Sequence, residues 1–127
     1  MSNEQWRRET ARISLRGSVK VAVRAIRVTE ALSKTPAGRV IAGQLLRSAT
    51  SAGANYEEAR GSESRRDFAH KIGISLKEMK ETRYWLRVTS EAGLLVDGRL
   101  AGLSGEVEEL CRILGRSLTT ARRAALS

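Results

Sequence analysis

The sequence predicts an all-α protein, an antiparallel up-down four-helix bundle. Apolar residues recur at helical spacing in four long segments, and no segment alternates as a strand would. The hydrophobic fraction is 41% but the aromatic fraction only 4%, so the core is mainly Leu, Ile, Val and Ala. Short connections place successive helices antiparallel. We therefore expect residues 1–127 to form one domain, with residues 1–13 as a flexible basic N-terminal segment.

The first helix is expected to run from Ser14 or Ser18 to Ser33. At about 100° per residue, its cations fall in one stripe and apolar residues occupy most of the remaining circumference. Such a wide apolar arc predicts burial against at least two neighbouring helices. The helix should stop at Thr35-Pro36, because the residue before proline disfavours helical angles.

The second helix is expected over residues 37–60, with an unusual number of small residues between Arg47 and Ala59. Leu45, Ala49, Ala52, Gly53 and Tyr56 share one face. A glycine inside a helix costs about 1 kcal/mol relative to alanine. We expect close backbone packing at Gly53 to offset that cost.

The third helix is expected over residues 64–92, between an N-cap at Ser64 and a C-cap at Gly93. One apolar stripe begins at Phe68, and Trp85 lies on another side, so this helix should have two packing partners. One side should close the bundle and the other should face a second copy of the chain. The i,i+4 pairs Asp67/Lys71 and Lys77/Glu81 have opposite charges and should support the helix.

The fourth helix is expected over residues 104–125, after a turn at Val96-Asp97-Gly98. Its inward face should be built from Val107, Leu110, Cys111, Leu114 and Leu118. Cys111 is the only cysteine, so neither an intrachain disulfide nor a thiolate cluster can form.

Catalytic motifs are absent, and we expect a protein that is not an enzyme. His70 is the only histidine, whereas a di-iron bundle needs two Glu-x-x-His motifs. No Gly-x-Ser-x-Gly elbow surrounds a serine, and the glycines lack phosphate-loop spacing. We therefore expect no catalytic residues, metal site or cofactor.

The net charge of +9 favours an anionic partner such as nucleic acid. Residues 1–36 alone hold eight Lys and Arg against three Glu. The candidate nucleic-acid-binding residues are Arg7, Arg8, Arg12, Arg16, Lys20, Arg24 and Arg27. A solvated face without function is the alternative interpretation. The scarcity of aromatic residues favours backbone contacts over base stacking.

A second polar set lies on the second and third helices. Its members, which could form an oligomer interface or polar network, are Asn55, Glu58, Lys71, Glu78, Glu81 and Trp85. They could line a ligand pocket, but a helix–helix or subunit interface with paired charges is the favoured interpretation. Arg47, Arg60 and Arg83 are close enough in sequence to balance the carboxylates.

Four segments carry a family resemblance: Gln44–Ala59, Asp67–Ile72, Lys77-Glu78 and Glu81–Leu86. They resemble bacterial four-helix bundle proteins encoded in intervening sequences of 23S rRNA genes. The resemblance implies an up-down bundle and a ring-shaped homopentamer. The family is also similar to the accessory protein of diversity-generating retroelements, a basic pentameric bundle that works with a reverse transcriptase and RNA. Motif positions, including Asn55, Glu58 and Trp85, are thereby implied to be structural or interfacial.

These observations lead to one functional hypothesis, one main alternative, and a third possibility, a small-molecule or metal enzyme. We expect a cytoplasmic, non-enzymatic homo-oligomer that binds nucleic acid, in particular RNA, through its basic first helix. The N-terminus lacks a secretory pattern, and no apolar run approaches the roughly 20 residues that span a bilayer. The alternative is a protein-interaction scaffold or accessory subunit whose partner is another protein.

Overall fold

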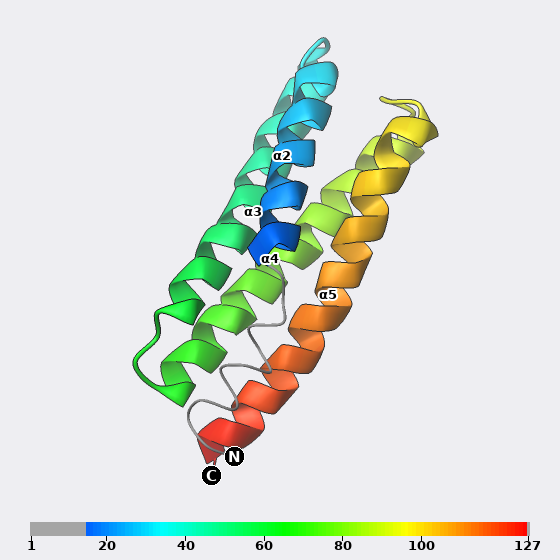
Figure 1. The fold of residues 1–127 in the computed structure, drawn as a ribbon. Coiled ribbons are helices and arrows are strands. Elements are labelled where there is room, and N and C mark those ends of the chain that lie inside the picture. Colours follow the sequence, from blue (N-terminus) through cyan, green and yellow to red (C-terminus); the bar gives the residue numbers. More distant parts are fainter. Residues whose placement is uncertain (1–14, 127) are drawn as a thin grey trace.

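A computed structural model describes residues 15–126, which form four antiparallel helices. They are α2 (Leu15–Leu32), α3 (Pro36–Arg60), α4 (Arg65–Glu91) and α5 (Asp97–Leu126). Figure 1 shows the α2–α3 and α4–α5 turns at one end of the bundle and the α3–α4 turn at the other. Each helix packs against its neighbours in sequence, and α2 also packs against α5. The predicted up-down four-helix bundle is confirmed.

The core is aliphatic, as the composition predicted. Leu45, Ile72, Leu103, Leu114 and Val107 are fully buried and come from three different helices. α2 contributes Val21 and Ala25 from one side of the bundle. Small residues in α3 let this helix lie close to its neighbours: the side chains of Ala49 and Ala52 have no exposed surface.

The predicted helix ends correspond to specific capping contacts. The Thr35 hydroxyl accepts a hydrogen bond from the Gly38 backbone N–H at 3.0 Å, and Pro36 occupies the first turn of α3. Ser64 Oγ accepts from the Asp67 N–H at 3.0 Å and caps α4. Gly93 has a φ of +66°, the left-handed conformation that glycine adopts without strain after a helix.

The fourth helix begins seven residues earlier than predicted, at Asp97, so the expected turn at Val96-Asp97-Gly98 is wrong. Asp97 and Gly98, which are common turn residues, made this segment look like a turn. Leu100 and Leu103 are nonetheless 3% and 1% exposed and extend the inward stripe towards the helix N-terminus. Burial of these two leucines outweighs the low helix propensity of Gly98 and Gly102.

The wide apolar arc of α2 is only partly buried. This helix does have two neighbours, α3 and α5, as predicted. However, Val19, Val23 and Ile26 remain 52%, 43% and 43% exposed. Their positions at i, i+4 and i+7 form an apolar stripe that no other described part of the chain covers.

Two finer expectations were also wrong. A Cβ added at Gly53 would meet Ser18 atoms at 3.6–3.8 Å, an ordinary contact distance, so the backbones do not require glycine there. Lys77 does not pair with Glu81, because the Glu81 carboxylate is engaged by α3 instead. The other predicted pair, Asp67–Lys71, is present at 3.6 Å.

The predicted N-terminal segment, residues 1–13, lies outside the described residues. Within residues 15–126, none of the helices is both long and apolar enough to cross a membrane.

Candidate nucleic-acid interface

Four of the seven predicted nucleic-acid-binding residues lie together on α2. Arg16, Lys20, Arg24 and Arg27 are exposed and occupy one side of the helix. From the first to the last they extend about 16 Å along the helix axis. The other three, Arg7, Arg8 and Arg12, lie outside the described residues.

These four cations line an open groove of about 620 Å³ between α2 and α5, which we call the α2–α5 groove. Its apolar lining includes Val19, Val23, Val28 and Leu103, and α5 adds a fifth cation, Arg99. The sequence interpretation missed Arg99 because it assigned this segment to the turn before the last helix. Once residues 97–126 are placed in one helix, Arg99 lies one turn before Leu103 and faces α2.

The cations of the α2–α5 groove differ in how their charge is balanced. Arg24 pairs with Glu106 of α5, with 3.1 Å between Nε and Oε1. Arg16, Lys20, Arg27 and Arg99 make no ion pair with any residue in the range 15–126. We call these four residues the basic face. Their uncompensated charge is what an anionic polymer would neutralise.

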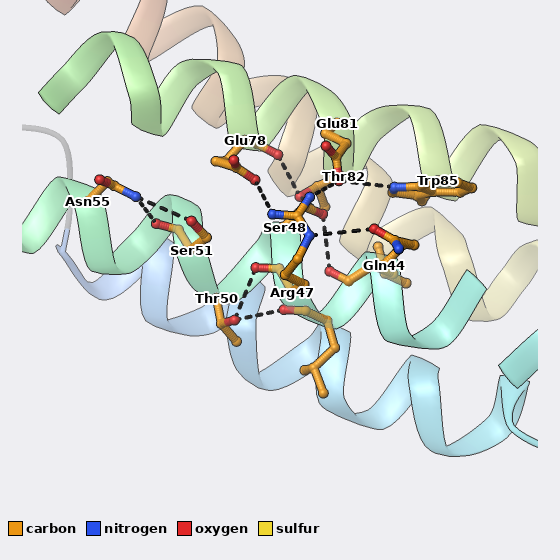
Figure 2. Close-up of polar contacts among 12 residues, drawn as sticks. Gln44, Arg47, Ser48, Thr50, Ser51, Asn55, Glu78, Glu81, Thr82 and Trp85 are labelled. Atoms are coloured by element: carbon orange, nitrogen blue, oxygen red, sulfur yellow. Dashed lines mark hydrogen bonds and ion pairs between the residues drawn. The ribbon is translucent and has the colours of Figure 1, made fainter. Parts of the chain in front are cut away.

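The predicted polar network is partly present, and Arg47 of α3 is at its centre. Figure 2 shows the Arg47 guanidinium between two carboxylates of α4: Nη1 lies 3.0 Å from Glu78 Oε2, and Nη2 donates to Glu81 Oε2. The same Glu81 oxygen accepts the indole N–H of Trp85 at 3.2 Å. Hydrogen bonds to Glu78 and Glu81 raise the pKa of Arg47 above its ordinary value, because both carboxylates favour the charged guanidinium.

The remaining members of that set do not join the network. Asn55 donates to its own helix, at the Ser51 carbonyl and hydroxyl (2.9 and 3.2 Å; Figure 2). Lys71 pairs with Asp67, and Glu58 is exposed. The structure thus brings Glu78, Glu81 and Trp85 together around an arginine, and their proposed role at an interface between copies stays a prediction.

Buried hydroxyl groups bind α3 to α4 beneath the Arg47 network. Ser48 Oγ and Thr82 Oγ1 are 2.9 Å apart, and both residues have no exposed surface. Ser75 Oγ donates to the Ala52 carbonyl at 2.7 Å. Together with Arg47, Glu78 and Glu81, these residues form what we call the α3–α4 seam. Every polar group needs a partner where two helices approach this closely.

Residues that could support other chemistry are isolated. Across the described chain, no three His, Cys, Asp or Glu side chains gather as a metal site would require. His70 is exposed on α4. Burial raises the pKa of the Cys111 thiol, which favours the protonated form over the nucleophilic thiolate.

Comparisons with known proteins agree with this architecture. A crystal structure of a protein of unknown function from the S23 ribosomal protein family of Bacteroides thetaiotaomicron VPI-5482 is similar, with a TM-score of 0.74 and 33% sequence identity. The similarity covers 79% of this chain and 93% of that one. No curated protein matches the chain. Residues 13–116 match the family described as 23S rRNA-intervening sequence protein. The chain therefore belongs to the 23S rRNA-intervening sequence protein family.

Proposed function

We propose that this protein is a non-enzymatic homo-oligomer that binds nucleic acid, with RNA as the favoured class, through the basic face. The single observation that carries the proposal is the uncompensated charge of Arg16, Lys20, Arg27 and Arg99 around one groove. Elsewhere on the bundle, Arg47 and Arg83 have acidic partners, whereas Arg112, Arg116 and Arg122 of α5 make no ion pair within residues 15–126 and do not line this groove. The family is described as 23S rRNA-intervening sequence protein, and this description supports RNA as the first ligand to test.

The contact would be made mainly to the phosphate backbone. No aromatic side chain lines the α2–α5 groove as described, so base stacking on aromatic rings has no support there. Such an interface depends on counterion release and should discriminate poorly between sequences.

The test is a salt titration of affinity, measured by fluorescence anisotropy with single-stranded RNA, duplex RNA and duplex DNA of equal length. Each neutralised phosphate contributes about −0.7 to −0.9 to the slope of log K against log salt. Three or four engaged cations predict a slope of roughly −2 to −4 per bound chain. Salt-independent binding, or no binding at low salt, would contradict the proposal.

A matched pair of triple variants locates the surface. Arg16→Gln/Lys20→Gln/Arg27→Gln removes three charges from the basic face and should abolish most of the salt-dependent binding. Arg112→Gln/Arg116→Gln/Arg122→Gln removes three exposed charges of α5 outside the α2–α5 groove and should have a much smaller effect. Equal losses in the two variants would mean that net charge alone, and not this groove, attracts the polymer.

Self-association is the second part of the proposal, and a pentamer is the expected form. It is supported by the exposed stripe of Val19, Val23 and Ile26, which a second copy would remove from water. A ring would also bring several basic faces together on one particle. Light scattering on nuclease-treated and untreated protein, with the absorbance ratio recorded, measures the oligomer mass and co-purifying nucleic acid. A monomer after nuclease treatment would contradict self-association.

The alternative function is a scaffold for another protein. The same variants and labelled nucleic acids distinguish it from nucleic-acid binding. A scaffold would capture a specific protein partner from nuclease-treated extract and would not bind the labelled RNA or DNA. The Arg16→Gln/Lys20→Gln/Arg27→Gln variant would then retain its partner at high salt. We propose no catalytic role, in agreement with the isolation of His70 and the burial of Cys111.

A further inference from the structure

Among the residues that the structure describes, Arg24 is the one cation of the α2–α5 groove with an acidic partner, and the partner helix has room to receive it. Its Nε lies 3.1 Å from Glu106 Oε1. Its Nη1 lies so close to Gly102 that a Cβ added at this glycine would be only 2.5 Å away. The guanidinium therefore lies in the space that a side chain at position 102 would fill. We call Gly102 and Glu106 together the Arg24 seat.

The seat is specific in its position along α5. Gly98 and Gly105 are the neighbouring glycines of this helix, and a Cβ at either would meet no atom within 4 Å. Each glycine within a helix lowers its stability relative to alanine. Only at Gly102 among these three does the missing side chain make room for another group. Glu106, one turn further along the same face, supplies the charge.

The charge of the partly buried Glu106 carboxylate is compensated by Arg24. Its side chain is 27% exposed, and Oε2 is buried with no hydrogen-bond partner in the described structure. A partly buried carboxylate with an unsatisfied oxygen requires a nearby cation. Arg16 and Lys20 line a neighbouring pocket with Glu106, but neither pairs with it. Between residues 15 and 126, Glu106 therefore pairs with Arg24 alone.

We infer that the seat holds Arg24 out of the anion-binding set, so that Gly102 and Glu106 set the strength of nucleic-acid binding. This inference rests on the proposed function of the basic face. A cation 3.1 Å from a carboxylate contributes little to the field beyond the pair, whereas the four residues of the basic face contribute fully. Arg24 must leave Glu106 before it can neutralise a phosphate.

The opposite role for the seat would be to orient Arg24 towards a phosphate while Nε stays bound to Glu106. The two roles predict opposite signs. If Arg24 is withheld, then releasing it from the seat strengthens binding. If Arg24 is oriented, then releasing it weakens binding.

Charge-matched variants of the full chain separate these roles in the anisotropy assay with single-stranded RNA. Arg24→Gln/Glu106→Gln removes a matched pair and should leave both the affinity and the salt slope at the wild-type values. Arg16→Gln/Glu109→Gln causes the same change of charge by removing a cation and an exposed acid that make no ion pair within residues 15–126. It should lose one phosphate contact, a weakening of about five- to eightfold at 0.1 M salt.

Two further variants release Arg24 by independent means. Glu106→Gln should tighten binding by about five- to eightfold at 0.1 M salt. The slope of log K against log salt should become more negative by about 0.7 to 0.9, the value for one phosphate contact. Glu109→Gln is its control and should have a smaller effect, because it removes a charge without freeing a cation. Gly102→Ala changes no charge, displaces the guanidinium and favours the helix, so it should also tighten binding. Gly105→Ala should not.

Two results would overturn the inference while leaving the proposed function intact. One is a loss of affinity in Arg24→Gln/Glu106→Gln as large as that in Arg16→Gln/Glu109→Gln. The other is binding by Glu106→Gln and Gly102→Ala no tighter than by their controls. If the wild-type protein binds neither RNA nor DNA at low salt, the proposed function fails and this role of the seat fails with it. Circular dichroism and thermal unfolding verify that each variant is folded.

Discussion

The α3–α4 seam and the α2–α5 groove both contain arginine and glutamate, but they use them differently. In the seam, Arg47 faces two carboxylates, and a layer of buried hydroxyl contacts lies beneath it. The groove is lined by five cations, of which Arg24 pairs with Glu106, and its apolar lining is open to solvent. In the seam, the charged groups pair with one another, whereas most cations of the groove have no acidic partner within residues 15–126.

The difference teaches that charge count alone does not identify a candidate binding surface in a basic protein. α4 carries cations as densely as α2, but Arg83 and Arg87 pair with Glu108 and Glu91 at 3.7 and 3.5 Å. On α2, Arg24 alone of the four groove cations pairs with an acid of the described chain. The proportion of cations without an acidic neighbour, and not their number, distinguishes the two surfaces.

The largest expected effect is on the free energy of unfolding, and it compares how tightly the two regions are packed. Leu45→Ala in α3 and Leu103→Ala in α5 each delete a buried leucine, and such changes cost about 2–5 kcal/mol. Leu45 is enclosed in the core, so its cavity should persist and its cost should lie in the upper part of this range. Leu103 lines the open groove, where neighbouring side chains and water can fill the space. Its cost should lie near 2 kcal/mol.

Urea unfolding followed by circular dichroism measures this difference. In both variants, the free energy of unfolding should fall with urea concentration at the wild-type slope, because the same surface is exposed on unfolding. A Leu103→Ala variant that is as destabilised as Leu45→Ala would mean that the groove side is as tightly packed as the seam.

A smaller effect is expected from the buried hydroxyl pair of the seam. Thr82→Val preserves the shape of the side chain but removes the contacts of Thr82 with Ser48 Oγ and the Glu78 carbonyl. A typical hydrogen bond contributes about 1 kcal/mol, so we expect a loss of about that size. Ser48 retains its own bond to the Leu45 carbonyl at 3.2 Å, which limits the cost.

The double variant Ser48→Ala/Thr82→Val supplies the control. If the two hydroxyls interact directly, the double variant should be less destabilised than the sum of the single variants. Additive costs would show that each hydroxyl contributes only through its own backbone bond.

The fold was largely predictable because its determinants are local. Helical periodicity, Pro36, Ser64 and Gly93 specify three of the four helices to within about one residue at most of their ends. The start of α5 was not predictable in this way, because Asp97 and Gly98 favour a turn locally. Only the burial of Leu100 and Leu103 against the other helices overrides that preference.

The candidate site was less predictable for the same reason. The helical stripe of Arg16, Lys20 and Arg27 follows from sequence spacing alone. The pairing of Arg24 with Glu106 joins residues 82 positions apart and depends on the approach of α2 to α5. Arg99 was missed because its segment was assigned to a turn. Ion pairs between helices depend on how the helices pack, and a local sequence pattern does not specify that packing.

The smallest expected effect concerns the side of α3 that faces α2. Gly53→Ala would place a Cβ 3.6 Å from the Ser18 side chain, an ordinary contact, and alanine favours a helix interior by about 0.5–1 kcal/mol. We therefore expect a gain in stability of that size in urea unfolding. Gly43→Ala is the matched control on the same helix, because its Cβ would meet nothing within 4 Å. If Gly53→Ala destabilises the protein while Gly43→Ala stabilises it, then α2 packs against α3 as tightly as α4 does.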